Sequence, residues 1–191
     1  MTLFLASASP RRVDLLRQAG IAFEQIPNLL LEEALPKVSA DIRADLRRLA
    51  KQKAWASKAD YQGLVLGVDT VVVLGKRILG KPETMDDAKA MLASLSGETH
   101  RVISAFCLLD TTSGKSVSRT ETTTVTFKML SPTDIDWYCT TFNPLDKAGS
   151  YGLQEVGNRF VARVSGSLDT VIGLPTKTLY PILKKRGIMV R

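Results

Sequence analysis

A long apolar run in the middle of the chain constrains the fold more than any other feature of the sequence. Residues 64–74 (LVLGVDTVVVL) are dominated by leucine and β-branched valine, and the polar pair Asp69 and Thr70 interrupts them. The run is far shorter than the roughly 18 residues of a membrane span, so it predicts a long buried β-strand. Further strands are predicted at residues 2–6, 22–26, 77–79, 101–109, 116–129 and 159–164, with 101–109 and 116–129 as an antiparallel pair.

Segments with helical signals alternate with the predicted strands. Ser9 followed by Pro10 is typical of a helix start, and Thr84 with Asp87 resembles a capping box. Helices are predicted at residues 10–19, 40–57, 84–95, 131–141 and 176–185. The strand–helix alternation, mixed with hairpin-like neighbours, predicts an α/β fold with a mixed sheet. Because no linker rich in Pro, Gly or Ser divides the chain, residues 1–191 are predicted to form a single domain.

Charge and composition exclude several classes of protein. The chain has 26 Lys and Arg against 19 Asp and Glu, a formal net charge of +7 that favours an anionic partner. Aromatic residues make up 6% of the chain and are not interleaved with a basic run, which argues against a nucleic-acid partner. His100 is the one histidine of the sequence, so neither a histidine-rich zinc site nor a Ser-His-Asp triad with its usual elbow motif is expected.

The cysteines and the start of the sequence indicate a compartment. Residues 1–6 are apolar but lack the basic region of a secretory signal peptide, and no run is long enough to cross a membrane. Cys107 and Cys139 lie in apolar surroundings and are expected to be reduced thiols. Together these features predict a cytoplasmic protein without a membrane partner.

Two arginines stand where a helix normally carries acidic residues. Arg11 and Arg12 fall in the first turn of the first predicted helix, where the helix dipole favours negative charge. With the hydroxyls of Ser7 and Ser9 and the free backbone N–H groups of the helix start, they could bind a phosphate group. The alternative is that both arginines point into solvent.

Asp69 and Lys53 also depart from their local patterns. A carboxylate inside a buried strand is costly unless a cation or hydrogen bonds compensate it, so Asp69 is a candidate metal ligand or general base. The alternative is that the strand ends at Asp69. Lys53 continues the apolar stripe of Leu46, Leu49 and Ala50, and it either extends to solvent or reaches into a site.

Three further segments carry weaker signals. Residues 75–81 have the spacing of a P-loop, but Pro82 stands where that motif needs a serine or threonine, so a P-loop is rejected. Lys81 remains a candidate phosphate ligand on its own. Residues 32–33 are an acidic pair, which by itself predicts an exposed loop. Residues 144–154 contain several glycines and are typical of a binding loop.

Taken together, these segments resemble the Maf family of nucleoside triphosphate pyrophosphatases. The matching segments occur in the family's order along nearly the whole chain, at residues 7–12 (SASPRR), 51–54 (KQKA), 67–72 (GVDTVV), 80–82 (GKP), 96–102 (SGETHRV), 146–154 (DKAGSYGLQ) and 173–175 (GLP). The resemblance implies a two-lobed α/β fold in which helices flank a long twisted mixed β-sheet, with a cleft between the lobes.

The resemblance also implies hydrolysis of a nucleoside triphosphate to the monophosphate and pyrophosphate, with Mg²⁺ or Mn²⁺ as the cofactor. Asp69 would be the catalytic base or a metal-linked carboxylate, and Glu32 or Glu33 would help to bind the metal. The triphosphate would be held by Ser7, Arg11, Arg12, Lys53 and Lys81. Whether the protein is a homodimer stays open.

Three residues point to one branch of this family. Members similar to the dTTP/UTP-cleaving branch carry the residue types found here at Arg11, Thr70 and Gln154, which would contact the substrate. A neutral amide at Gln154 suits the imide edge of uracil or thymine. The alternatives are a pyrophosphatase for modified purine triphosphates such as 7-methyl-GTP, or a non-enzymatic nucleotide- or DNA-binding protein involved in septum formation. His100 is expected to be a structural residue of a turn.

Overall fold

One mixed β-sheet organises the computed structural model, which describes residues 1–30, 38–58 and 61–189. The strand order is β2-β1-β3-β5-β6-β7, and β4 pairs with β3. The strands are β1 (Leu3–Ala6), β2 (Glu24–Ile26), β3 (Leu64–Leu74), β4 (Arg77–Leu79), β5 (Thr99–Asp110), β6 (Ser116–Phe127) and β7 (Val161–Ser165). The predicted α/β fold with a mixed sheet flanked by helices is confirmed.

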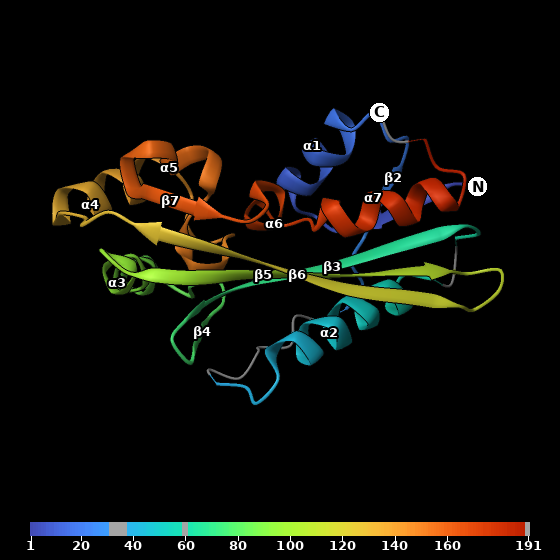
Figure 1. Cartoon of the computed structure of the whole chain (residues 1–191), viewed down its shortest axis with the longest axis horizontal. Helices are drawn as coiled ribbons and strands as arrows, with labels where there is room; N and C mark the ends of the chain where they lie inside the picture. Colours follow the sequence, from blue (N-terminus) through green and yellow to red (C-terminus); the bar gives the residue numbers. More distant parts are fainter. Residues whose placement is uncertain (31–37, 59–60, 190–191) are drawn as a thin grey trace.

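Helices cover the two ends of the sheet differently (Figure 1). They are α1 (Pro10–Gln18), α2 (Ile42–Ala56), α3 (Met85–Leu95), α4 (Pro132–Thr141), the 3-10 helix η1 (Ala148–Ser150), α5 (Leu153–Phe160), α6 (Leu168–Ile172) and α7 (Thr176–Lys185). At one end, α1 and α7 pack on one face of the sheet and α2 packs on the other. At the other end, α3, α4 and α5 surround the far ends of β3, β5 and β6. The helices therefore form two groups, joined by the long central strands.

β3 has a gap in its pairing along one edge. β5 pairs antiparallel with β3 from Leu64 to Val73 and so occupies one edge. The opposite edge pairs with β1 up to Gly67 and with β4 from Val72. Within the described ranges, no strand pairs with residues 68–71 on that edge. The polar interruption of the apolar run therefore marks a break in strand pairing, and β3 continues through it.

α2 packs directly on the backbone of β3 at Gly67. A Cβ atom added to Gly67 would lie 2.2 Å from the backbone oxygen of Ala50 and 2.6 Å from the backbone nitrogen of Ala54. Glycine is therefore required at this crossing. The close approach brings Lys53 of α2 toward Asp69, which lies two residues after Gly67 and on the same face of the strand.

Some elements differ from the sequence-based expectation. The sequence pattern does not predict α5 and α6, because α6 has five residues and α5 is kinked at Gly157, where φ is 42° and ψ is −138°. The predicted strand at residues 159–164 begins two residues later, as β7, because α5 takes up its start. No helix in the described part of the chain combines the length and apolar character needed to span a membrane.

His100 lies in β5 and not in the expected turn. Its ring is 1% exposed, its Nε2 atom is 2.7 Å from the hydroxyl oxygen of Tyr151, and it packs edge-on against Phe127. Burial lowers the pKa of His100 to about 4, because the charged imidazolium would lose its solvation there. His100 is therefore a structural residue, as expected, but it lies in the core and not in a turn.

Acid should destabilise the protein through His100. In the unfolded chain a histidine has a pKa of about 6.5, so between pH 6.5 and 4 the unfolded state binds more protons than the folded state. This stabilising contribution is complete above about pH 6.5 and is lost as the pH falls toward 4, and it amounts to about 3 kcal/mol. Urea unfolding of the wild type and of His100→Gln over this pH range would measure it. Parallel pH profiles for the two proteins would contradict the expectation.

Candidate active site

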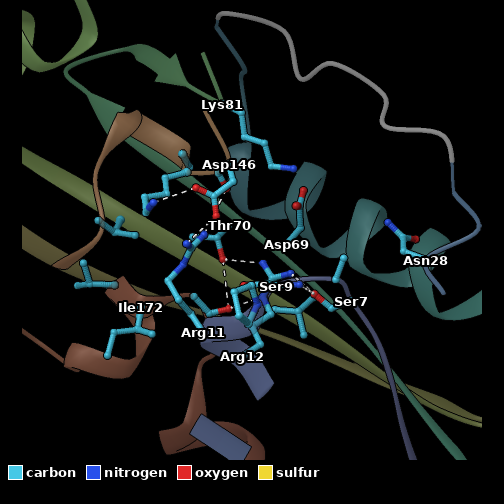
Figure 2. A pocket seen from close by; sticks show the side chains of 18 of the residues that line it. Ser7, Ser9, Arg11, Arg12, Asn28, Asp69, Thr70, Lys81, Asp146 and Ile172 are labelled. Atoms are coloured by element: carbon cyan, nitrogen blue, oxygen red, sulfur yellow. Dashed lines mark hydrogen bonds and ion pairs between the residues drawn. The ribbon is translucent and has the colours of Figure 1, made fainter. Parts of the chain in front are cut away.

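A pocket lies beside the gap in β3 (Figure 2). Its lining comes from segments that are far apart in the sequence: the start of α1, α2, the middle of β3, the residues around η1 and the end of α6. Seven residues predicted from the sequence line it, namely Ser7, Arg11, Arg12, Lys53, Asp69, Thr70 and Lys81. The fold therefore brings most of the candidate site residues to one place.

The start of α1 forms one wall of this pocket. β1 ends at Ala6, residues 7–9 connect it to the helix, and Pro10 is the first helical residue. In the described structure the N-cap residue, Ser9, makes no side-chain capping hydrogen bond, and the first turn of α1 carries no acidic residue. The backbone N–H groups and the positive end of the helix dipole are therefore available to an anion.

Arg12 is held by three hydrogen bonds. Its Nε donates to the carbonyl oxygen of Gly173 at 2.9 Å, its Nη1 to Oγ of Ser7 at 2.9 Å and its Nη2 to Oγ1 of Thr70 at 3.3 Å. Burial lowers the pKa of Arg12 to about 10, because the charged guanidinium loses solvation. Arg12 therefore keeps its charge at neutral pH and presents a planar cation to the pocket in a fixed orientation.

Arg11 pairs with Asp146, a residue that the sequence analysis did not assign to the site. Nη1 of Arg11 donates to Oδ2 of Asp146 at 2.8 Å, and Nη2 donates to its backbone oxygen at 3.2 Å. Burial acts to raise the pKa of Asp146, but hydrogen bonds from Lys147 and Arg11 outweigh burial and lower the pKa. The carboxylate therefore stays charged and holds Arg11 at the pocket wall.

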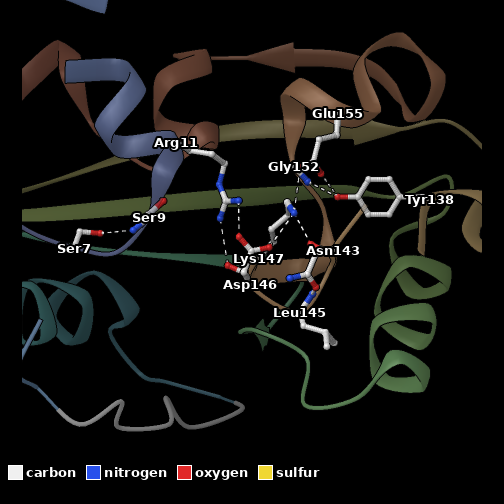
Figure 3. A network of polar contacts seen from close by, with 10 residues as sticks. All are labelled: Ser7, Ser9, Arg11, Tyr138, Asn143, Leu145, Asp146, Lys147, Gly152 and Glu155. Carbon is white, nitrogen blue, oxygen red and sulfur yellow. Dashed lines mark hydrogen bonds and ion pairs between the residues drawn. The ribbon is translucent and has the colours of Figure 1, made fainter. Parts of the chain in front are cut away.

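Lys147 lies at the centre of a polar network beside this pair (Figure 3). Its Nζ is 2.9 Å from Oδ1 of Asp146 and 3.1 Å from Oε1 of Glu155, and it donates to the backbone oxygen of Asn143. Tyr138 donates its hydroxyl proton to the other carboxylate oxygen of Glu155. The Lys147 side chain is only 5% exposed, so the two carboxylates offset the cost of burying its charge.

Lys53 and Asp69 form a separate ion pair in the pocket. Nζ of Lys53 is 2.7 Å from Oδ1 of Asp69, and the side chains are 12% and 16% exposed. Lys53 therefore reaches into the site and does not extend to solvent. Figure 2 shows the Lys81 side chain extending toward the same part of the pocket. Lys81 follows Gly80, whose carbonyl oxygen accepts a hydrogen bond of 2.9 Å from the N–H of Gly149 in η1.

One predicted residue within the described ranges is not brought to the pocket. Gln154 does not line it, because its side chain is exposed on α5 while the next residue, Glu155, takes the inward position beside Lys147. Neighbouring side chains on a helix point in different directions, so only one of the two can face inward here. Glu32 and Glu33 lie outside the described residues.

The structure adds site residues that sequence reasoning missed. Asp146 and Lys147 lie in the segment that its glycines marked as a binding loop, but their pairing with Arg11 and Glu155 depends on the fold. Asn28 also lines the pocket, and nothing in its local sequence distinguishes it.

The pocket offers a carboxylate of the kind that Mg²⁺ and Mn²⁺ bind. Among the described residues, no three His, Cys, Asp or Glu side chains lie close enough together to hold a metal ion by themselves. Mg²⁺ is commonly held by one or two carboxylates together with phosphate oxygens of a substrate. Asp69 beside a set of cations fits that arrangement, so the described residues suit a divalent ion that binds with a phosphate ligand.

The chain is similar in sequence to proteins of known name. Residues 2–186 match the model of the Maf family, described as "Maf-like protein". A dTTP/UTP pyrophosphatase of Syntrophomonas wolfei subsp. wolfei (strain DSM 2245B / Goettingen) is 42% identical over 184 residues, which cover 96% of each chain. One of Anaeromyxobacter dehalogenans is 43% identical over 187 residues, which cover 97% of this chain and 94% of the relative. One of Escherichia coli O6:K15:H31 is 43% identical over 184 residues, which cover 95% and 91%.

Proposed function

The chain belongs to the Maf family, and on that premise we propose that it is a nucleoside triphosphate pyrophosphatase that hydrolyses dTTP and UTP to the monophosphate and pyrophosphate. The observation that carries the proposal is the cluster of cations in the pocket that contains Asp69. Arg11, Arg12, Lys53 and Lys81 line the same pocket as Asp69, beside the free N–H groups at the start of α1. A single phosphate group needs only part of this set, whereas a triphosphate can contact all of it.

In this proposal Asp69 accepts a proton from the attacking water. The water oxygen forms a bond with the α-phosphorus, and the bond between the α-phosphorus and the oxygen that bridges to the β-phosphate breaks, which releases pyrophosphate. Lys53 holds the carboxylate through its 2.7 Å contact with Oδ1. Asp69, with Glu32 or Glu33, would hold Mg²⁺ or Mn²⁺, which supplies positive charge to the triphosphate oxygens when bound.

The selectivity for dTTP and UTP in this proposal rests on the relatives that are named for these substrates. Gln154 is exposed on α5, so its position in the structure does not support contact with the base. Val72, Val102 and Ile172 line the same pocket as the cations and provide an apolar surface for a base or sugar.

An assay of products tests the proposal. The purified protein is incubated with dTTP, UTP, dATP or 7-methyl-GTP and with Mg²⁺ or Mn²⁺, in water enriched in ¹⁸O. We expect pyrophosphate and a monophosphate from dTTP and UTP, with the ¹⁸O in the monophosphate because water attacks the α-phosphorus.

Each other result has a definite meaning in this assay. Release of orthophosphate, or ¹⁸O in the pyrophosphate, would show attack at a different phosphorus. A higher kcat/KM for 7-methyl-GTP than for dTTP would assign the protein to the other substrate class. If the protein hydrolyses none of the nucleotides, the alternative of a non-enzymatic binding protein remains and the proposal is overturned.

A further inference from the structure

A buried serine on β5 is connected to Arg12 through Thr70. Ser104 is 0% exposed, and its Oγ is 2.8 Å from Oγ1 of Thr70 and 2.8 Å from the backbone oxygen of Thr170. Oγ1 of Thr70 in turn accepts from Nη2 of Arg12 at 3.3 Å. Ser104 does not line the pocket, yet only one side chain separates it from the arginine.

The hydrogen-bond partners determine which way the hydroxyl protons point. A hydroxyl has one proton to donate, whereas a backbone carbonyl can only accept. If Ser104 donates to the Thr170 carbonyl, Thr70 can donate to Ser104, and both bonds are 2.8 Å long. In the reverse arrangement Ser104 donates to Thr70, so the Thr170 carbonyl receives no proton from Ser104. Thr70 must then donate to the carbonyl oxygen of Gly173, which is 3.4 Å away. The first arrangement has the shorter bonds and is favoured.

The bond to Ser104 has a consequence for Arg12. It fixes the position of the Thr70 hydroxyl, whose oxygen keeps a lone pair that accepts from Nη2 of Arg12. Thr170, whose carbonyl accepts from Ser104, is itself anchored, because its hydroxyl donates to Glu121 at 2.9 Å. Thr70 therefore helps Gly173 and Ser7 to hold the guanidinium, and buried Ser104 supports Thr70 from behind.

We propose that Ser104 is a positioning residue that orients Arg12 for the substrate phosphates by fixing the position of the Thr70 hydroxyl. The inference rests on the proposed function, because it deepens the role of Arg12 in binding the triphosphate. Without the serine hydroxyl, Oγ1 of Thr70 loses the 2.8 Å contact that fixes its position, and the hold on the guanidinium loosens.

Removing the serine hydroxyl should weaken phosphate binding without lowering kcat to a similar extent. Loss of one buried hydrogen bond is worth about 1 kcal/mol, or about fivefold in affinity. For Ser104→Ala we expect KM for dTTP, and the Kd for inorganic tripolyphosphate measured by calorimetry, to rise about fivefold, while kcat changes less than twofold. Ser104→Thr, which restores a hydroxyl, should return both values to those of the wild type.

Thr123→Val is the matched control. Thr123 is 1% exposed on the neighbouring strand β6, and its hydroxyl donates to the backbone oxygen of Ser167, at the start of the same helix α6, at 2.9 Å. We expect a similar loss of unfolding free energy in this variant and in Ser104→Ala, but no change in Kd for tripolyphosphate in Thr123→Val. Equal changes in Kd for the two variants would show a general effect of hydroxyl loss and overturn the proposal.

A double-mutant cycle tests the path through Thr70. If Ser104 acts through Thr70, the variant Thr70→Val/Ser104→Ala has the Kd of Thr70→Val alone, whereas additive changes contradict this path. The calorimetric measurement separates this inference from the proposed function. A wild type that binds tripolyphosphate but hydrolyses no nucleotide refutes only the proposed activity, and one that hydrolyses dTTP but binds no tripolyphosphate refutes only this inference.

Discussion

Replacing Asp69 with asparagine is expected to lower kcat for dTTP by about 100-fold or more, the scale on which loss of a general base acts. The amide has nearly the shape of the carboxylate and can still accept from Lys53, so the fold should remain. It cannot take a proton from water at neutral pH. The measurement is the rate of pyrophosphate release at saturating dTTP, with far-UV circular dichroism to check the fold.

Asp136→Asn provides the matched control for this experiment. Asp136 also pairs with a lysine, Lys89 at 2.6 Å, but it lies outside the pocket on the exposed side of α4. Its replacement should leave kcat unchanged. An Asp69→Asn protein with nearly normal turnover would show that Asp69 is structural and that another group activates water.

The second large effect is expected at Lys147. Lys147→Met keeps the volume and removes the charge, so Glu155 loses its cation and Asp146 keeps only Arg11. The carboxylates left behind are 41% and 26% exposed, so water replaces part of the lost interaction and the expected destabilisation is about 1–3 kcal/mol, below the value for a fully buried pair. Urea unfolding followed by fluorescence should show a loss of unfolding free energy of that order.

Lys89→Met is the control for the stability measurement. Lys89 and Asp136 also form an ion pair, but their side chains are 42% and 58% exposed, so water compensates for its loss. The unfolding midpoint of Lys89→Met should stay close to that of the wild type. Equal losses of unfolding free energy in the two variants would mean that the burial of Lys147 does not determine how much it stabilises the protein.

The sequence predicted those parts of the protein whose cause is local. The apolar run of β3 has β-formers on both sides of Asp69, and the arginines at the start of α1 conflict with the helix dipole at their own positions. Both features were therefore visible before the fold was known. For Asp69 the sequence left open whether the strand ends there, and the unbroken pairing of β3 with β5 from Leu64 to Val73 shows that it continues.

The parts that depend on tertiary contacts could not be predicted. Whether Lys53 reaches a site or solvent depends on the close packing of α2 on Gly67. The inward position of Glu155, and hence the exposed one of Gln154, depends on the buried amine of Lys147. In both cases the local sequence allows either direction, and the choice is made by a partner on another element.

The pocket has a consequence for the order in which the protein matures. Arg11 and Asp146 are 135 residues apart in the chain, and Arg12 and Gly173 are 161 residues apart. Contacts of such separation close only when most of the polypeptide has been synthesised and has collapsed, since loop closure over long distances is slow. A nascent chain on the ribosome therefore carries Arg11 without Asp146, and Arg12 without Gly173, until the last quarter of the protein is synthesised. Under the proposed function, newly made copies would spare the cell's nucleotide pool until folding is complete.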